Sequence, residues 1–176
     1  MNFATALDRV EAVLSVGGWR SAVAGGIALA AYGNPRVTLD LDIVTEWPAQ
    51  DTLVPALESA GYATLYRSSG FSNHLHPDRE WGRVDVIYVQ NDTADRLFAG
   101  ARVVDGPAGR SIRVLRPEHL IAMKVQAMKN APERRWQDMA DIRYLLDLSG
   151  VDRDEARGYF EKAGLIARWE ELERGR

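Results

Sequence analysis

The stretch Arg36-Val-Thr-Leu-Asp-Leu-Asp-Ile-Val44 carries two aspartates one residue apart, Asp40 and Asp42, among apolar neighbours. Side chains on an extended strand alternate between its two faces, so we expect Asp40 and Asp42 to share one face, with the leucines and Ile43 on the other. Two carboxylates this close repel each other unless a cation lies between them, and hard oxygen ligands suit Mg²⁺ bound to substrate phosphates. The stretch therefore predicts a strand with one apolar face and one metal-binding face.

Upstream, Ala22-Val-Ala-Gly-Gly-Ile-Ala-Leu-Ala-Ala-Tyr-Gly33 predicts a short apolar strand, a turn at Gly25 and Gly26, and a helix of small residues. A glycine turn lets the backbone approach an anion closely, and the helix start offers unpaired N–H groups and a positive dipole end. This combination indicates a phosphate-binding turn. The Gly-Lys-Ser/Thr of a Walker loop and the Gly-x-Gly-x-x-Gly of a dinucleotide site are both missing, so those two kinds of nucleotide site are disfavoured.

A third acid, Asp85, lies in Arg83-Val-Asp-Val-Ile-Tyr-Val89, which reads as another strand. An acid among β-branched neighbours is costly to bury unless it is paired or bound to a metal. Two interpretations stay open at this point. Asp85 is either a metal ligand or general base, or it is a structural acid that pairs with Arg83.

Taken in this order, the glycine pair, the Asp-x-Asp and the later strand aspartate resemble the nucleotidyltransferase superfamily related to DNA polymerase beta, in its minimal form. The stretches Leu115–Ala127 and Arg134–Ile142 are similar to those of AbiEii-type toxins and of small antibiotic nucleotidyltransferases. The resemblance covers residues 18–146. It implies an α+β protein with the nucleotidyltransferase fold, a mixed β-sheet flanked by helices with a C-terminal helical bundle.

The resemblance also implies roles for particular residues. Asp40, Asp42 and Asp85 match the metal-binding and catalytic acids, which would hold two Mg²⁺ ions, with Mn²⁺ as an alternative. The residues expected to bind the nucleotide are Gly25, Gly26, Arg36, Thr38, Lys124 and Asp138. Gly26 stands where many members have serine, so a hydroxyl contact to phosphate is lost and backbone N–H groups must replace it.

The activity implied by the resemblance is the transfer of a nucleoside monophosphate from an NTP, ATP among them, to an acceptor hydroxyl, with release of pyrophosphate. Candidate acceptors are the 3′ end of a tRNA, a protein, or a small hydroxylated molecule. A toxin of this kind would have a cognate antitoxin protein as partner. The alternatives are an aminoglycoside-type antibiotic nucleotidyltransferase, a phosphohydrolase at the same metal site, and a non-catalytic regulatory partner with this fold.

Composition narrows the class of protein. The 176 residues suffice for one domain, and we expect a catalytic core over 1–116 with a helical part over 117–176 packed on it as a single compact unit. No apolar run approaches the length of a membrane span, and the chain has no cysteine, which together favour a cytoplasmic protein. A formal charge of −3 argues against a protein that coats nucleic acid, although five cations between Lys124 and Arg143 could form a local basic patch.

Periodicity and turn residues predict the remaining elements. Helices are expected over 3–16, between Pro48 and Gly61, and over 93–101, 117–127, 133–148 and 152–163, and strands over 21–24, 38–44, 63–67, 83–89, 102–104 and 112–115. The polar segment 68–82 is expected to be an irregular loop. It contains His74 and His76, for which a surface or acceptor-binding loop is favoured over a zinc site.

Lys124 falls on the apolar stripe of its predicted helix, where a lysine must pair or extend its amine to solvent. Asp138 and Asp141 lie on the next predicted helix, so an ion pair between Lys124 and Asp138 is expected. A contact from Lys124 to triphosphate and a purely structural ion pair are both open. Trp81 and Trp136 are candidates for stacking on an acceptor, against the commoner role of tryptophan in the core.

Overall fold

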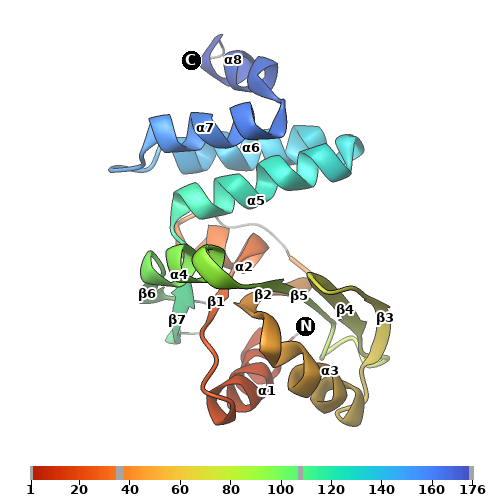
Figure 1. Ribbon diagram of the computed structural model, residues 1–176. Helices are drawn as coiled ribbons and strands as arrows, with labels where there is room; N and C mark the ends of the chain where they lie inside the picture. The colour runs from red at the N-terminus through yellow and green to blue at the C-terminus, as the bar shows by residue number, and fades with distance from the viewer. Residues whose placement is uncertain (1, 35–37, 107–108, 175–176) are drawn as a thin grey trace. The chain divides into compact units, whose positions relative to one another are not determined.

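The structure is a computed structural model that describes residues 2–34, 38–106 and 109–174 (Figure 1). Contacts divide the chain into two units, Met1–Leu115 and Arg116–Arg176. Unit 1 combines a sheet with helices, whereas the described part of unit 2 is helical. The two units are described separately below.

Within its described residues, unit 1 has a mixed sheet of seven strands in the order β3-β4-β5-β2-β1-β7-β6. The strands are β1 (Ser21–Val23), β2 (Asp40–Glu46), β3 (Ala63–Arg67), β4 (Phe71–Leu75), β5 (Arg83–Val89), β6 (Arg102–Asp105) and β7 (Ser111–Val114). Strand β2 runs parallel to β5 and antiparallel to β1, and β1 runs parallel to β7. The pairs β3–β4, β4–β5 and β6–β7 are antiparallel.

Helices flank this sheet on both sides (Figure 1). They are α1 (Phe3–Val16), α2 (Gly25–Ala31), the 3-10 turn η1 (Trp47–Ala49), α3 (Gln50–Ser59) and α4 (Asn91–Ala99). Helices α1 and α3 contact each other and lie on the same side of the sheet (Figure 1). Leu41, Ile43, Val84 and Val86 are fully buried, which is the hydrophobic reason for that packing. Alternation along the strands then leaves the opposite face for the acids.

Unit 2 consists of α5 (Pro117–Asn130), the 3-10 turn η3 (Pro132–Arg134), α6 (Arg135–Leu146), α7 (Arg153–Ala163) and α8 (Ile166–Arg174). Helix α7 begins where Asp152 accepts a hydrogen bond from the Glu155 N–H at 2.9 Å, and it ends at Gly164 in the left-handed conformation. Helix α5 contacts α6 and α7, and α8 contacts α7. The rings of Phe160 and Trp169, 5.6 Å apart, join the last two helices.

Most predicted elements are confirmed, but one prediction is wrong, one strand begins later than predicted, and one helix was missed. The segment 68–82 is not an irregular loop, because it contains β4. The strand predicted over 38–44 begins only at Asp40, so Leu39 precedes it and is exposed. A last helix, α8, was not predicted at all. In the part of the chain that is described, no helix has the length and apolarity needed to cross a membrane.

Candidate active site

The pairing of β2 with β5 brings three acids together on one face of the sheet. The two strands are parallel, and Asp42 is the register partner of Asp85. Leu41 and Ile43 point into the core, so Asp40 and Asp42 point the other way and remain partly exposed, as does Asp85 on β5. Register partners on neighbouring strands are about 4.8 Å apart, which puts the carboxylates of Asp42 and Asp85 side by side. Asp40, Asp42 and Asp85 are called the acid face below.

The diglycine turn lies directly against the acid face. The Ala24 N–H donates to the Asp42 carbonyl at 2.9 Å, which holds the start of α2 beside β2. Gly25 has φ +55°, and a Cβ built there would lie 1.8 Å from Asp42 Oδ2. A Cβ at Gly26 would lie 2.7 Å from the Cβ of Thr38. Only glycine allows both the left-handed backbone at position 25 and the close approach of Asp42.

Each outer member of the acid face already has a partner within unit 1. Asp40 Oδ1 accepts from Thr38 Oγ1 at 3.0 Å and from the Leu39 N–H at 3.2 Å. Asp85 Oδ1 accepts from Arg83 Nε at 2.8 Å. The hydrogen bond to Asp85 raises the pKa of the Arg83 guanidinium, and the charges of Asp85, Asp40 and Asp42 add to it. The pairing of Asp85 with Arg83, one of the two interpretations from the sequence, is therefore present.

The carboxylates of the acid face are of the chemical type that binds divalent cations. Three carboxylates on one face supply hard oxygen ligands, and the space beside Asp42 is kept open by Gly25. Across residues 2–34, 38–106 and 109–174, no three His, Cys, Asp or Glu side chains are already grouped closely enough to hold a metal ion. Asp40 Oδ1 accepts from Thr38 and Asp85 Oδ1 accepts from Arg83, so a metal that used this oxygen of Asp85 would have to displace Arg83 from it.

A second charged cluster lies inside unit 2. Lys124 on α5 contacts Asp138 Oδ1 at 3.2 Å and Asp141 Oδ2 at 2.5 Å on α6. The three side chains are nearly buried, with 13%, 2% and 8% of their areas exposed. Asp138 Oδ2 is buried without a hydrogen-bond partner among the described residues. The predicted Lys124–Asp138 pair is thus present, and Asp141 is a partner of Lys124 that the sequence did not single out. These three residues are called the lysine cluster.

The structure therefore places the predicted site residues in two groups. Gly25, Gly26 and Thr38 join the acid face in unit 1, while Lys124 and Asp138 belong to unit 2. Arg36 lies outside the described residues, so its predicted phosphate contact stays a prediction.

The histidine prediction is wrong for His74. His74 lies on β4, is completely buried, and contacts Ser72 Oγ at 2.8 Å and Thr64 Oγ1 at 3.0 Å. Burial lowers its pKa to about 4. His76 accepts a hydrogen bond from the Asp78 N–H at 3.0 Å, and its ring lies 5.0 Å from that of Tyr62. His74 is accordingly a neutral core residue and takes no part in an acceptor loop or a zinc site.

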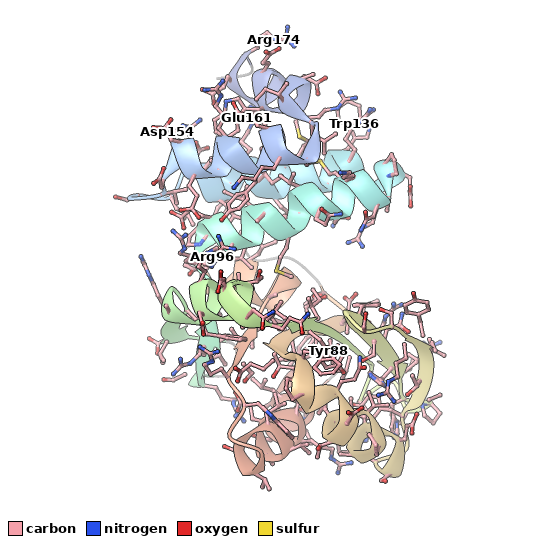
Figure 2. The ribbon with its side chains drawn as sticks, viewed as in Figure 1. Tyr88, Arg96, Trp136, Asp154, Glu161 and Arg174 are labelled. Atoms are coloured by element: carbon pink, nitrogen blue, oxygen red, sulfur yellow. The ribbon has the colours of Figure 1, made fainter. Side chains whose placement is uncertain are left out.

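Several of the five cations between Lys124 and Arg143 are engaged by neighbours within unit 2. Lys124 is in the lysine cluster, and Arg143 donates to the Leu172 carbonyl at 3.1 Å. Arg135 lies over the ring of Trp136 at 4.4 Å, and Trp136 is 71% exposed at the surface of the unit (Figure 2). Lys129 and Arg134 are exposed, so they are available for a basic patch.

One cavity lies at the opposite end of β2 and β5 from the acid face, with a volume of about 330 Å³. Arg20 lines it and forms ion pairs with Glu46 at 2.7 Å and Asp95 at 2.9 Å, and Trp47 lines it as well. No sequence motif indicated this cavity, because its ion pairs join residues from β2, α4 and the segment before β1, which are far apart in the chain.

Comparisons with known proteins identify the family of the chain. Residues 10–174 match the family model described as nucleotidyl transferase AbiEii toxin, Type IV TA system. No curated protein matches significantly.

Solved structures share the fold. The antibiotic-resistance factor ANT(2'')-Ia superposes with a TM-score of 0.68 at 17% identity, over 99% of this chain and 98% of that chain. The lincosamide antibiotic adenylyltransferase LnuA gives 0.55 at 16% identity, over 82% and 97%. A putative nucleotidyltransferase from Thermotoga maritima gives 0.54 at 17% identity, over 77% and 92%. These likenesses establish the nucleotidyltransferase fold.

The family match spans both units, from α1 to α8, and includes the diglycine turn, the acid face and the lysine cluster. Together with the fold and the arrangement of the acids, it shows that the chain belongs to the AbiEii family of nucleotidyltransferase toxins of type IV toxin–antitoxin systems.

Proposed function

We propose that this protein transfers a nucleoside monophosphate from an NTP to an acceptor hydroxyl in a reaction that requires a divalent metal. The observation that carries the proposal is the acid face: Asp42 and Asp85 are register partners on parallel strands, with Asp40 on the same side. Carboxylates that share one face of a sheet repel each other, which favours the entry of a cation beside them.

Asp40 and Asp42 would hold the metal, most simply two Mg²⁺ ions with Mn²⁺ as an alternative, and Asp85 would complete the site. Two such ions stabilise the charge that develops on the attacking and leaving oxygens during phosphoryl transfer. Asp85 is suited to accept the proton of the acceptor hydroxyl, provided that it lies within hydrogen-bond reach of that hydroxyl. The acceptor oxygen then forms its bond to the α-phosphorus, and the bond from that phosphorus to the departing pyrophosphate breaks.

The diglycine turn would bind the triphosphate through its backbone. No side chain caps α2 at Ala24, so the N–H groups at its start are open to an anionic ligand. Gly25 and Gly26 keep side-chain atoms out of that approach. Thr38 holds Asp40 through its hydroxyl, and its role is to orient a metal ligand as well as to line the turn.

Lys124 and Asp138 have two roles consistent with their contacts. The lysine cluster either supplies a positive charge to the triphosphate or only fastens α5 to α6. The candidates for the acceptor are an RNA 3′ end, a protein and a small hydroxylated molecule. The family name adds a cognate antitoxin as the expected partner.

The proposal is tested by intact-mass analysis of candidate acceptors after incubation with each NTP and Mg²⁺. A transferase adds the mass of one nucleotide to an acceptor and releases pyrophosphate. A phosphohydrolase at the same site would release phosphate without an adduct, and a non-catalytic partner would leave the NTP intact. Asp42→Asn is the control, because it removes one carboxylate at nearly constant volume. An adduct formed equally by wild type and Asp42→Asn would refute the acid-face mechanism.

A further inference from the structure

Arg83 lies on the same face of the sheet as the three carboxylates of the acid face. It precedes Asp85 by two residues on β5, so both side chains leave the strand on the same face, and it is the register partner of Asp40. Its Nε donates to Asp85 Oδ1 at 2.8 Å, and the charges of Asp40 and Asp42 also act on it. Arg83 thus pairs with Asp85 and lies within electrostatic range of the other two carboxylates.

This compensation uses an atom that a metal would need. A carboxylate oxygen engaged by a guanidinium is directed away from its neighbours, and a nearby positive charge opposes the entry of a second cation. The absence of a ready-made three-ligand group among the described residues matches this orientation. The side chain of Arg83 is 40% exposed, so its guanidinium can move into solvent. A cation that took its place would keep a charge partner for Asp85, whose side chain is only 15% exposed. Arg83 therefore has both the position and the freedom of an exchangeable counter-ion.

We propose that Arg83 is the built-in counter-ion of the acid face, which holds the three carboxylates together when no metal is bound and competes with the divalent cation for Asp85. The inference rests on the proposed function, because it assumes that the acid face binds metal. It adds that Arg83 sets the affinity of the acid face for the divalent cation. Arg83 is a positioning residue in this scheme, since it acts through Asp85.

The competition predicts a tighter metal site when the charge of Arg83 is removed. Binding of MnCl₂ alone, without nucleotide, is measured from the electron paramagnetic resonance signal of free Mn²⁺ on the full chain. Arg83→Gln is expected to lower the Kd for Mn²⁺ by about tenfold, because loss of a neighbouring charge outweighs the loss of order at Asp85. Arg83→Lys keeps the charge but loses the guanidinium geometry, and is expected to lower the Kd by only about threefold.

Metal-free stability gives a second readout. Arg83→Gln is expected to melt below wild type without metal, because the repulsion within the acid face is no longer compensated, and to gain more in Tm from MnCl₂. Arg67→Gln is the matched control, because Arg67 is a similarly exposed strand arginine that pairs with Asp51, away from the acid face. That variant should bind Mn²⁺ as wild type does.

The outcomes separate this inference from the proposed function. Unchanged or weaker Mn²⁺ binding by folded Arg83→Gln would overturn the competition, while the metal site itself would stand. If Arg83→Gln does not fold, Arg83→Lys decides, and a Kd equal to or above that of wild type would overturn the inference. If wild type and Asp42→Asn alike show no saturable Mn²⁺ binding, the metal site falls, and the inference falls with it.

Discussion

The acid face and the lysine cluster have the same kind of composition, several aspartates around one cation, but they differ in burial. On the acid face the cation is Arg83, whose side chain is 40% exposed, while that of its partner Asp85 is 15% exposed. In the lysine cluster Lys124 and its aspartates are nearly buried between α5 and α6.

That difference decides what each group can do. A partly exposed ion pair is weak and can be exchanged for another cation at low cost. A buried one is strongly held, because separating it leaves a charge without solvent or partner. We therefore expect the acid face to be a site for ligands and the lysine cluster to be chiefly a fastening within unit 2.

The largest expected effect is on catalysis at the acid face. Asp42→Asn should lower transfer by about a thousandfold or more, because an amide cannot supply the charge that the metal needs. Without metal the variant should melt at or above wild type, because repulsion with its neighbours is relieved. The measurements are steady-state turnover and a thermal melt. Asp51→Asn, which removes an exposed acid of α3, should leave turnover unchanged. Full activity in Asp42→Asn would contradict the catalytic role of the acid face, which would then be structural like the lysine cluster.

The next effect is on the stability of unit 2. Lys124→Met should destabilise it by about 3 to 5 kcal/mol, because two buried carboxylates lose their cation. The measurement is urea unfolding followed by circular dichroism. Arg157→Met is the matched control: Arg157 pairs with Glu161 on the exposed side of α7, and its loss should cost no more than about 0.5 kcal/mol. Native stability combined with lost NTP affinity in Lys124→Met would instead give the lysine cluster a role in nucleotide binding.

Substitutions in the glycine turn test whether the close approach of the turn to the acid face is needed for NTP binding. Gly25→Ala should raise the KM for NTP by about a hundredfold, since it combines left-handed strain with a clash against the Asp42 carboxylate. Gly26→Ala would also be crowded, by the Thr38 side chain, but position 26 has no left-handed backbone, so its effect should be smaller. Gly158→Ala, in open space on α7, should leave KM unchanged and add up to about 1 kcal/mol of stability. Equal KM values for all three variants would contradict the phosphate-binding role of the turn.

The sequence allowed the acids and the glycines to be predicted because their spacing is local. Alternation along a strand puts Asp40 and Asp42 on one face whatever the rest of the chain does. The register that sets Asp42 beside Asp85 depends on pairing between distant strands, and only the structure shows it. The partnership of Asp141 with Lys124 is likewise a matter of packing between two helices.

The failure at β4 has a specific physical cause. Phe71-Ser-Asn-His-Leu75 contains three polar residues, which is typical of a loop by composition. Ser72 and His74 are nevertheless buried, because Ser72 contacts His74 and Tyr88 and His74 contacts Thr64. Hydrogen bonds to residues of other strands thus satisfy the polar side chains of β4 and allow a strand that the residue types disfavour. These hydrogen bonds join residues far apart in the sequence, so no local pattern predicts them.

The smallest expected effect comes from this buried network. It differs from the acid face and the lysine cluster because burial here favours the uncharged form of a side chain, that of His74. Burial lowers the pKa of His74 to about 4, below its ordinary value of 6.5, so the unfolded chain binds more protons than the folded one between these pH values. Stability should therefore fall as the pH drops through this window, by about 2 kcal/mol between pH 7 and pH 5. His74→Gln should remove that part of the pH dependence in urea unfolding experiments. Thr64→Val keeps the imidazole and should keep the dependence, although it loses one hydrogen bond at both pH values. An unaltered pH dependence in His74→Gln would show that burial does not keep His74 neutral in the folded protein.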